Sequence, residues 1–121
     1  MDSPRVALIN RLFDLMEHHD LGGAAEELLA NSAEDVVFEP HASQGREIRG
    51  HDELRRFWAE FAEECRQLRA GAYSVEEEDD AVIVNGWVRT IDEGRLADTQ
   101  SRWVYRFNDE GKVVSARVER D

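Results

Sequence analysis

Apolar residues in the first part of the chain recur with the period of an α-helix. Ser3 and Pro4 suit a helix N-cap and first turn. The apolar positions that follow them at helical spacing are Val6, Ile9, Leu12, Phe13 and Met16. Leu21-Gly22-Gly23 should interrupt this pattern, and a second short helix is expected from Ala24 to Ala30. The chain therefore predicts two helices at its beginning.

A third helix is predicted from about His51 to Leu68. Its apolar positions form one wide stripe and are Leu54, Phe57, Trp58, Phe61, Cys65 and Leu68. Because three aromatic residues share this face, we expect the helix to cover a broad, concave surface.

The rest of the chain has the composition and the two-residue alternation of β-strands. Strands are expected at Val36–Glu39, briefly around Glu47–Ile48, and then throughout the chain beyond Gly71, at Ala81–Val88, Arg95–Phe107 and Lys112–Glu119. The acidic run Glu76–Asp80 is interpreted as a solvated turn. This order predicts one α+β domain over residues 1–121, with helices on one face of a curved, mostly antiparallel sheet.

The composition says more about which partners the protein could bind than about which reaction it could catalyse. The chain has 27 acidic and 15 basic residues, a net charge of -12, which disfavours nucleic acid and anionic membrane surfaces. No export signal or membrane span is expected near the N-terminus. Cys65 is the lone cysteine, so it has no partner for an internal disulfide; it is interpreted as a packed core thiol in a reducing, cytoplasmic protein.

The strongest candidate for chemistry is Glu39, which precedes Pro40 at the end of a predicted strand. Ten residues after Pro40, the segment Gly50–Leu54 opens the third helix. Burial of a carboxylate against such an apolar face raises its pKa toward neutrality, where it can take and return a proton. Glu39 is therefore a candidate general base, and the alternative is that it merely solvates a strand end.

The segments Phe38–Pro40, Gly50–Leu54 and Arg106–Val114 together resemble the ketosteroid-isomerase and SnoaL-like polyketide-cyclase group. This group shares the cone-shaped open barrel of the nuclear-transport-factor-like superfamily. The resemblance covers nearly the whole chain and implies that Glu39 stands at the catalytic carboxylate, where aspartate is usual. It also implies that Leu12 and Trp103 replace the usual tyrosine and aspartate donors of the oxyanion hole.

Two side chains of the long strand are candidate substitutes for the missing donors. Tyr105 and Trp103 face the same side of a regular strand and are assigned as donors to an enolate; the alternative is that they are space-filling aromatics. Arg120, expected at the pocket mouth, either meets an anionic ligand group or neutralises acidic surface. The residues expected to contact a ligand are Leu12, Phe13, His41, Leu54, Phe57, Trp58, Phe61, Ala116, Val118 and Arg120.

No metal site or cofactor is expected. The four histidines form no His-x-x-x-His pair, and no Cys-x-x-Cys, phosphate loop or dinucleotide motif is present. His41, two residues from Glu39, is a candidate proton-relay neighbour.

Two functions are compatible with these patterns. The first is a cofactor-independent isomerase or cyclase, with Glu39 as base, acting on a small apolar or carbonyl-containing molecule. The second is a non-catalytic ligand-binding or dimerisation module. A homodimer through the exposed sheet face is expected, with Trp87 as a candidate anchor.

Overall fold

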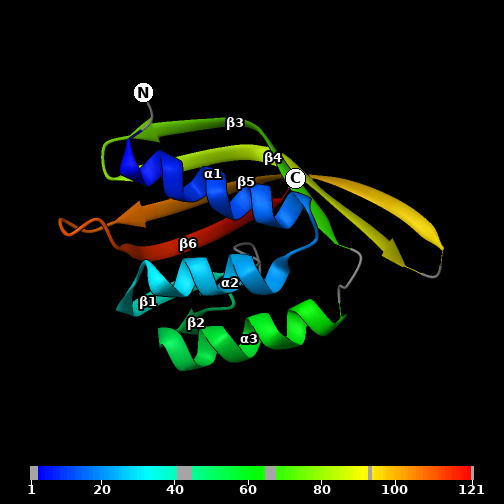
Figure 1. Cartoon of the computed structure of the whole chain (residues 1–121), viewed down its shortest axis with the longest axis horizontal. Helices are drawn as coiled ribbons and strands as arrows, with labels where there is room; N and C mark the ends of the chain where they lie inside the picture. Colours follow the sequence, from blue (N-terminus) through cyan, green and yellow to red (C-terminus); the bar gives the residue numbers. More distant parts are fainter. Residues whose placement is uncertain (1–2, 41–44, 65–67, 93, 121) are drawn as a thin grey trace.

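The computed structural model describes residues 3–40, 45–64, 68–92 and 94–120, and it is an α+β structure of three helices and a six-stranded mixed sheet. The helices are α1 (Pro4–Glu17), α2 (Leu21–Ala30) and α3 (Gly50–Glu64). The strands are β1 (Ser32–Glu39), β2 (Ile48–Arg49), β3 (Arg69–Glu78), β4 (Ala81–Asp92), β5 (Arg95–Phe107) and β6 (Val113–Arg120). The helices lie over one face of the sheet (Figure 1), as the sequence predicted.

The sheet is open, with strand order β2-β1-β6-β5-β4-β3. All neighbouring strands are antiparallel except β1 and β6, which run parallel. The chain therefore brings its first long strand beside its last one. We call the face covered by the helices the inner face, and the opposite face the outer face.

Local capping explains where the first two helices begin. The Ser3 hydroxyl accepts a hydrogen bond from the Val6 amide at 3.2 Å, and Pro4 occupies the first turn of α1. The chain breaks before α2 as expected, but at residues 18–20 rather than at Leu21-Gly22-Gly23, because Asp20 accepts a hydrogen bond from the Gly23 amide at 2.8 Å. This N-cap places both glycines in the first turn of α2 and starts the helix at Leu21.

Three other boundaries differ from the sequence expectation. β1 begins at Ser32, four residues before Val36, because Ser32 already pairs with Val113 of β6. The acidic run is mostly strand, since β3 pairs with β4 as far as Glu78 and only Asp79 and Asp80 turn. Leu68 is buried but lies before β3 and is not helical, and Cys65 lies outside the described residues.

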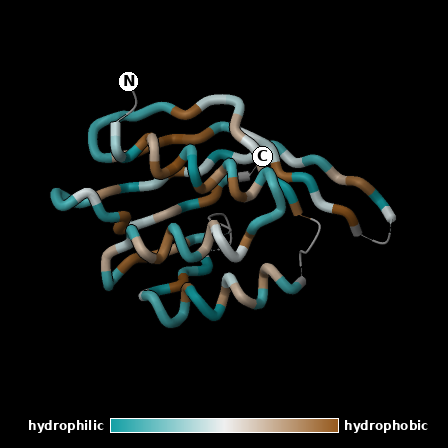
Figure 2. The backbone as a smooth tube through the Cα atoms, viewed as in Figure 1, coloured by the Kyte–Doolittle hydropathy of each residue, from teal (hydrophilic) through white to brown (hydrophobic). Residues whose placement is uncertain are grey.

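Alternation along the strands separates core from surface. Val82, Val84 and Val88 of β4 are buried on the inner face, whereas Trp87 between them lies half-buried on the outer face. Figure 2 shows short hydrophobic stretches that alternate with hydrophilic ones along both the helices and the strands. The ends of β4 and β5 extend past the helices as a two-stranded ribbon (Figure 1), which carries the exposed side chains of Ile91 and Leu96.

Strands β3 and β4, at one edge of the sheet, approach each other closely near Gly71 and Gly86. A Cβ atom on Gly86 would lie 2.1 Å from the carbonyl oxygen of Gly71, so only glycine fits there. None of the described helices is long and apolar enough to cross a membrane.

Candidate functional site

The inner face of the sheet and the helices enclose an apolar cavity of about 270 Å³. Its wall comes from all three helices and from β1, β3, β4, β5 and β6. The lining residues are Leu12, Met16, Ala24, Leu28, Phe38, Pro40, Arg46, Phe57, Trp58, Phe61, Leu68, Ala70, Val88, Trp103, Tyr105 and Val118. The cavity thus follows the sheet surface beneath the helices rather than a loop on the exterior.

An aromatic cluster from α3 and β1 forms one side of the cavity. Phe57, Trp58 and Phe61 recur on one face of α3, and Phe38 meets them from β1. The Phe38 ring centroid lies 5.5 Å from that of Phe57 and 5.8 Å from that of Trp58. Phe57 and Phe61 stack at 5.7 Å. These spacings are typical of packed aromatic pairs, so this wall is rigid and apolar.

Strand β5 supplies the opposite wall. Trp103 and Tyr105 are two residues apart and both point to the inner face, as the alternation predicted. Phe13 of α1 supports them edge-on, with ring centroids at 4.8 Å from Trp103 and 6.4 Å from Tyr105. Phe13 therefore packs against the cavity wall without lining the cavity.

Two polar groups that line the cavity, one on each wall, have no hydrogen-bond partner among the described residues. The Tyr105 hydroxyl makes no hydrogen bond within the described part of the chain, and burial raises the pKa of the Tyr105 phenol. The buried indole N–H of Trp58 likewise has no partner there. Since buried phenols and indoles usually find a partner, the Tyr105 hydroxyl is available to a ligand oxygen.

One charged side chain belongs to the described lining of the cavity. Arg46 is exposed, and its guanidinium lies 5.4 Å from the centroid of the Phe57 ring. This cation–π contact places a positive charge at the border between the aromatic wall and solvent.

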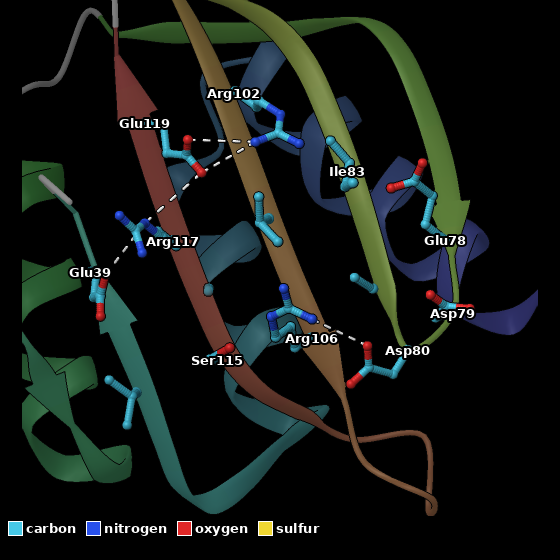
Figure 3. Close-up of a pocket in the computed structure, with 14 residues that line it drawn as sticks. Glu39, Glu78, Asp79, Asp80, Ile83, Arg102, Arg106, Ser115, Arg117 and Glu119 are labelled. Carbon is cyan, nitrogen blue, oxygen red and sulfur yellow. Dashed lines mark hydrogen bonds and ion pairs between the residues drawn. The ribbon is translucent and has the colours of Figure 1, made fainter. Parts of the chain in front are cut away.

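Glu39 lies on the other face of the sheet. In Figure 3 its carboxylate meets Arg117 of the neighbouring strand β6, with 3.7 Å between Glu39 Oε2 and Arg117 Nε. Because Phe38 points inward, the two-residue alternation of β1 turns Glu39 outward. The expectation that Glu39 faces the aromatic surface of the third helix is corrected, and the structure does not bring it together with Tyr105 and Trp103.

The groove that contains Glu39 is a separate feature of about 400 Å³ on the outer face. Ion pairs cross it, between neighbouring strands and between β5 and the turn that joins β3 to β4 (Figure 3). Arg102 lies 3.3 Å from Glu119, and Arg106 lies 3.2 Å from Asp80. The paired side chains are partly exposed, and such pairs contribute at most about 1 kcal/mol each. This groove therefore has the character of a charged sheet surface rather than of a dry catalytic site.

The other expected site residues divide into three groups. Leu12, Phe57, Trp58, Phe61, Trp103, Tyr105 and Val118 line the cavity. Leu54 and Ala116 are buried in the core, and Ala116 borders the outer groove instead. His41 and the Arg120 side chain lie outside the described part of the structure.

Sequence reasoning missed Arg46 because nothing in its polar loop marks it. It missed Val88 and Ala70 because their inward direction depends on strand register. By contrast, the alternation of Val36, Val37, Phe38 and Glu39 contained the signal for the direction of Glu39. Among the described residues, no group of three or more His, Cys, Asp or Glu side chains is placed to hold a metal ion.

Three helices over one face of an open six-stranded sheet, with an apolar cavity between them, define an α+β pocket fold. The SnoaL-like domain model matches residues 9–116, so the chain belongs to the SnoaL-like family. Among curated proteins, none matches the sequence significantly.

Solved structures agree on the fold. A protein from Jannaschia sp. CCS1, provisionally named a SnoaL-like polyketide cyclase, is 19% identical with a TM-score of 0.82, over 100% of this chain and 90% of that one. An NTF2-like protein of unknown function from Burkholderia pseudomallei K96243 is 22% identical with a TM-score of 0.79, over 99% and 92%. Another from Exiguobacterium sp. 255-15 is 19% identical with a TM-score of 0.75, over 94% and 98%.

Proposed function

We propose that this chain binds a small, mostly apolar molecule with an oxygen acceptor in the cavity beneath its helices. The observation that carries the proposal is the wall itself: a cavity of about 270 Å³ lined mostly by aromatic and aliphatic side chains, in which the Tyr105 hydroxyl has no hydrogen-bond partner among the described residues. A buried apolar cavity of about 150 Å³ already binds benzene in another protein. The present volume therefore suits a two-ring or medium-chain molecule.

The polar group on the ligand follows from Tyr105. A phenol kept neutral by burial donates a hydrogen bond well, and a carbonyl or hydroxyl oxygen is the acceptor it requires. This supports a carbonyl-containing or similar oxygenated ligand.

Proton transfer by Glu39 is not supported for a molecule held in this cavity, since Glu39 faces the outer groove beside Arg117. Neither aspartate, glutamate nor histidine is among the described residues that line the cavity. The geometry thus favours ligand binding over isomerisation or cyclisation driven by a carboxylate base.

A series of straight-chain alcohols from 1-hexanol to 1-decanol tests the proposal. Trp58 and Trp103 line the cavity, so binding should change the tryptophan fluorescence. Each added CH₂ that enters the cavity should tighten binding about fourfold, because its burial is worth about 0.8 kcal/mol. The increments should vanish once the chain fills the cavity.

A filled cavity provides the matched control. Ala24→Met places a larger side chain in the cavity from α2 and should weaken 1-decanol binding at least about tenfold. Ala97→Met makes the same change on the exposed ribbon and should leave binding unchanged. Equal affinities in both variants and the unmodified protein would refute the cavity as the binding site.

We also propose that the outer face of the sheet forms a homodimer. Supporting this, Tyr73 is 65% exposed there, and the half-buried Trp87 ring lies on the same face beneath the Arg89 guanidinium, 5.7 Å away. Light scattering on Trp87→Arg tests it, with circular dichroism to verify folding. A variant that folds and keeps a dimeric mass would remove Trp87 from the interface.

A further inference from the structure

Arg46 lies at the border of the cavity, and its positive charge has no acidic counterpart in the described lining. The net charge of the chain is -12, and acidic residues outnumber basic ones by 27 to 15. Nevertheless, the one charged side chain in the described lining of the cavity is a cation. An arginine at the rim of an apolar cavity is the arrangement expected for recognition of an anionic head group.

The surroundings of Arg46 leave its guanidinium unpaired. Within residues 3–40, 45–64, 68–92 and 94–120, Arg46 makes neither an ion pair nor a hydrogen bond. The adjacent carboxylate, Glu47, pairs with Arg49 instead. By contrast, most of the arginines that the structure describes on the outer face, such as Arg102 and Arg106, have acidic partners. The Arg46 donors therefore remain free for a ligand.

Contact with Phe57 positions this charge relative to the cavity. The guanidinium lies 5.4 Å from the Phe57 ring centroid, and the same ring belongs to the cavity wall. A guanidinium held against an aromatic ring by a cation–π contact loses part of its freedom of movement before binding, and its fork of donors suits a carboxylate. A ligand whose apolar body touches Phe57 thus brings an acid at its outer end within the region of Arg46.

We propose that the ligand of this cavity is an amphiphilic monocarboxylate, with its carboxylate at Arg46 and a mostly apolar body inside that offers an oxygen acceptor to Tyr105. The inference rests on the proposed binding function and adds the chemical class of the ligand. The global negative charge opposes an anion only weakly here, because charges beyond about 8 Å are screened at physiological ionic strength.

Decanoate and 1-decanol form a matched pair of probes that differ at the head group. Fluorescence titrations of the full chain at physiological ionic strength should show that Arg46→Gln weakens decanoate binding about fivefold, the upper range for an exposed ion pair. The same variant should bind 1-decanol within about twofold of the unmodified protein. Added salt should reduce the decanoate affinity and leave that of 1-decanol unchanged.

Arg49→Gln is the control variant. It removes the same charge three residues from Arg46, but from a side chain that is already paired with Glu47. It should bind both probes as the unmodified protein does. Equal loss of decanoate binding in both variants, or no loss in Arg46→Gln, would overturn the assignment to a carboxylate while the cavity proposal stands. Failure of both probes to bind the unmodified protein would overturn the proposed function, and this inference with it.

Discussion

Removal of the Tyr105 hydroxyl tests the interior of the cavity without altering its shape. Loss of a satisfied hydrogen bond typically costs about 1 kcal/mol, whereas removal of a buried hydroxyl without a partner is neutral or stabilising. Tyr105 is 4% exposed and has no hydrogen bond in the described part of the chain. We therefore expect Tyr105→Phe to change the unfolding free energy at pH 8 by between zero and about 1 kcal/mol, in the stabilising direction.

Alkaline pH should enlarge this difference in a calculable way. Burial raises the pKa of Tyr105 in the folded protein, while an unfolded tyrosine titrates near about 10. The folded state therefore keeps a proton that the unfolded state has released. Its contribution to stability is complete below about pH 10 and falls by about 1.4 kcal/mol for each further pH unit, until the folded group itself titrates. Tyr105→Phe has no phenol to titrate at this position, so its stability should not show this fall with pH.

Urea unfolding followed by circular dichroism at pH 8 and pH 11 measures both effects. From pH 8 to pH 11 the unmodified protein should lose about 1.4 kcal/mol relative to Tyr105→Phe. Tyr73→Phe is the control, because it removes an exposed ring's hydroxyl and keeps Tyr105, so it should lose stability as the unmodified protein does. The reasoning would be refuted if the unfolding free energy of Tyr105→Phe fell equally steeply between pH 8 and pH 11, or if this variant were destabilised by more than about 1 kcal/mol at pH 8.

Three further predictions concern single substitutions. Glu39→Gln should leave 1-decanol affinity within about twofold in the fluorescence titration, because Glu39 faces the outer groove; a tenfold loss would instead place it at the ligand. Asp20→Ala removes the N-cap of α2 and should lower the urea-unfolding free energy by about 1 kcal/mol; no change would show that the cap is dispensable. Gly86→Ala should lower the free energy of unfolding by more than about 4 kcal/mol or prevent folding, because its Cβ would meet the Gly71 carbonyl. Gly22→Ala is the contrasting substitution: its Cβ has open space in a helix, so it should raise the free energy of unfolding by about 0.5–1 kcal/mol. A tolerated Gly86→Ala would show that β3 and β4 can separate.

The helices and most of the strands could be predicted because their signals are local. The spacing of Ile9, Leu12 and Phe13 is enough to define one buried helix face, and all three are buried. The alternation of Trp103 and Tyr105 likewise predicted their shared side. The error at Leu21 was also local, since Asp20 offered an N-cap that outweighs the poor helix propensity of two glycines.

The site was harder to predict because its members meet only through tertiary contacts. The direction of Glu39 was readable from the alternation with Phe38, but the hypothesis of a general base buried against the third helix placed it on the wrong face. Arg46 reaches the cavity through its contact with Phe57, eleven residues away on a different element. No periodicity in the sequence encodes such a contact.

The sequence by itself determined an α+β domain, its hydrophobic faces and its separation into buried and charged surfaces, because helix and strand periods act over a few residues. The tertiary structure alone decided that β1 lies parallel to β6, that a cavity remains between the helices and the inner face, and that this cavity contains a phenol and an arginine but not Glu39. These features depend on register and on packing between distant segments, and their free energies arise only once those segments meet.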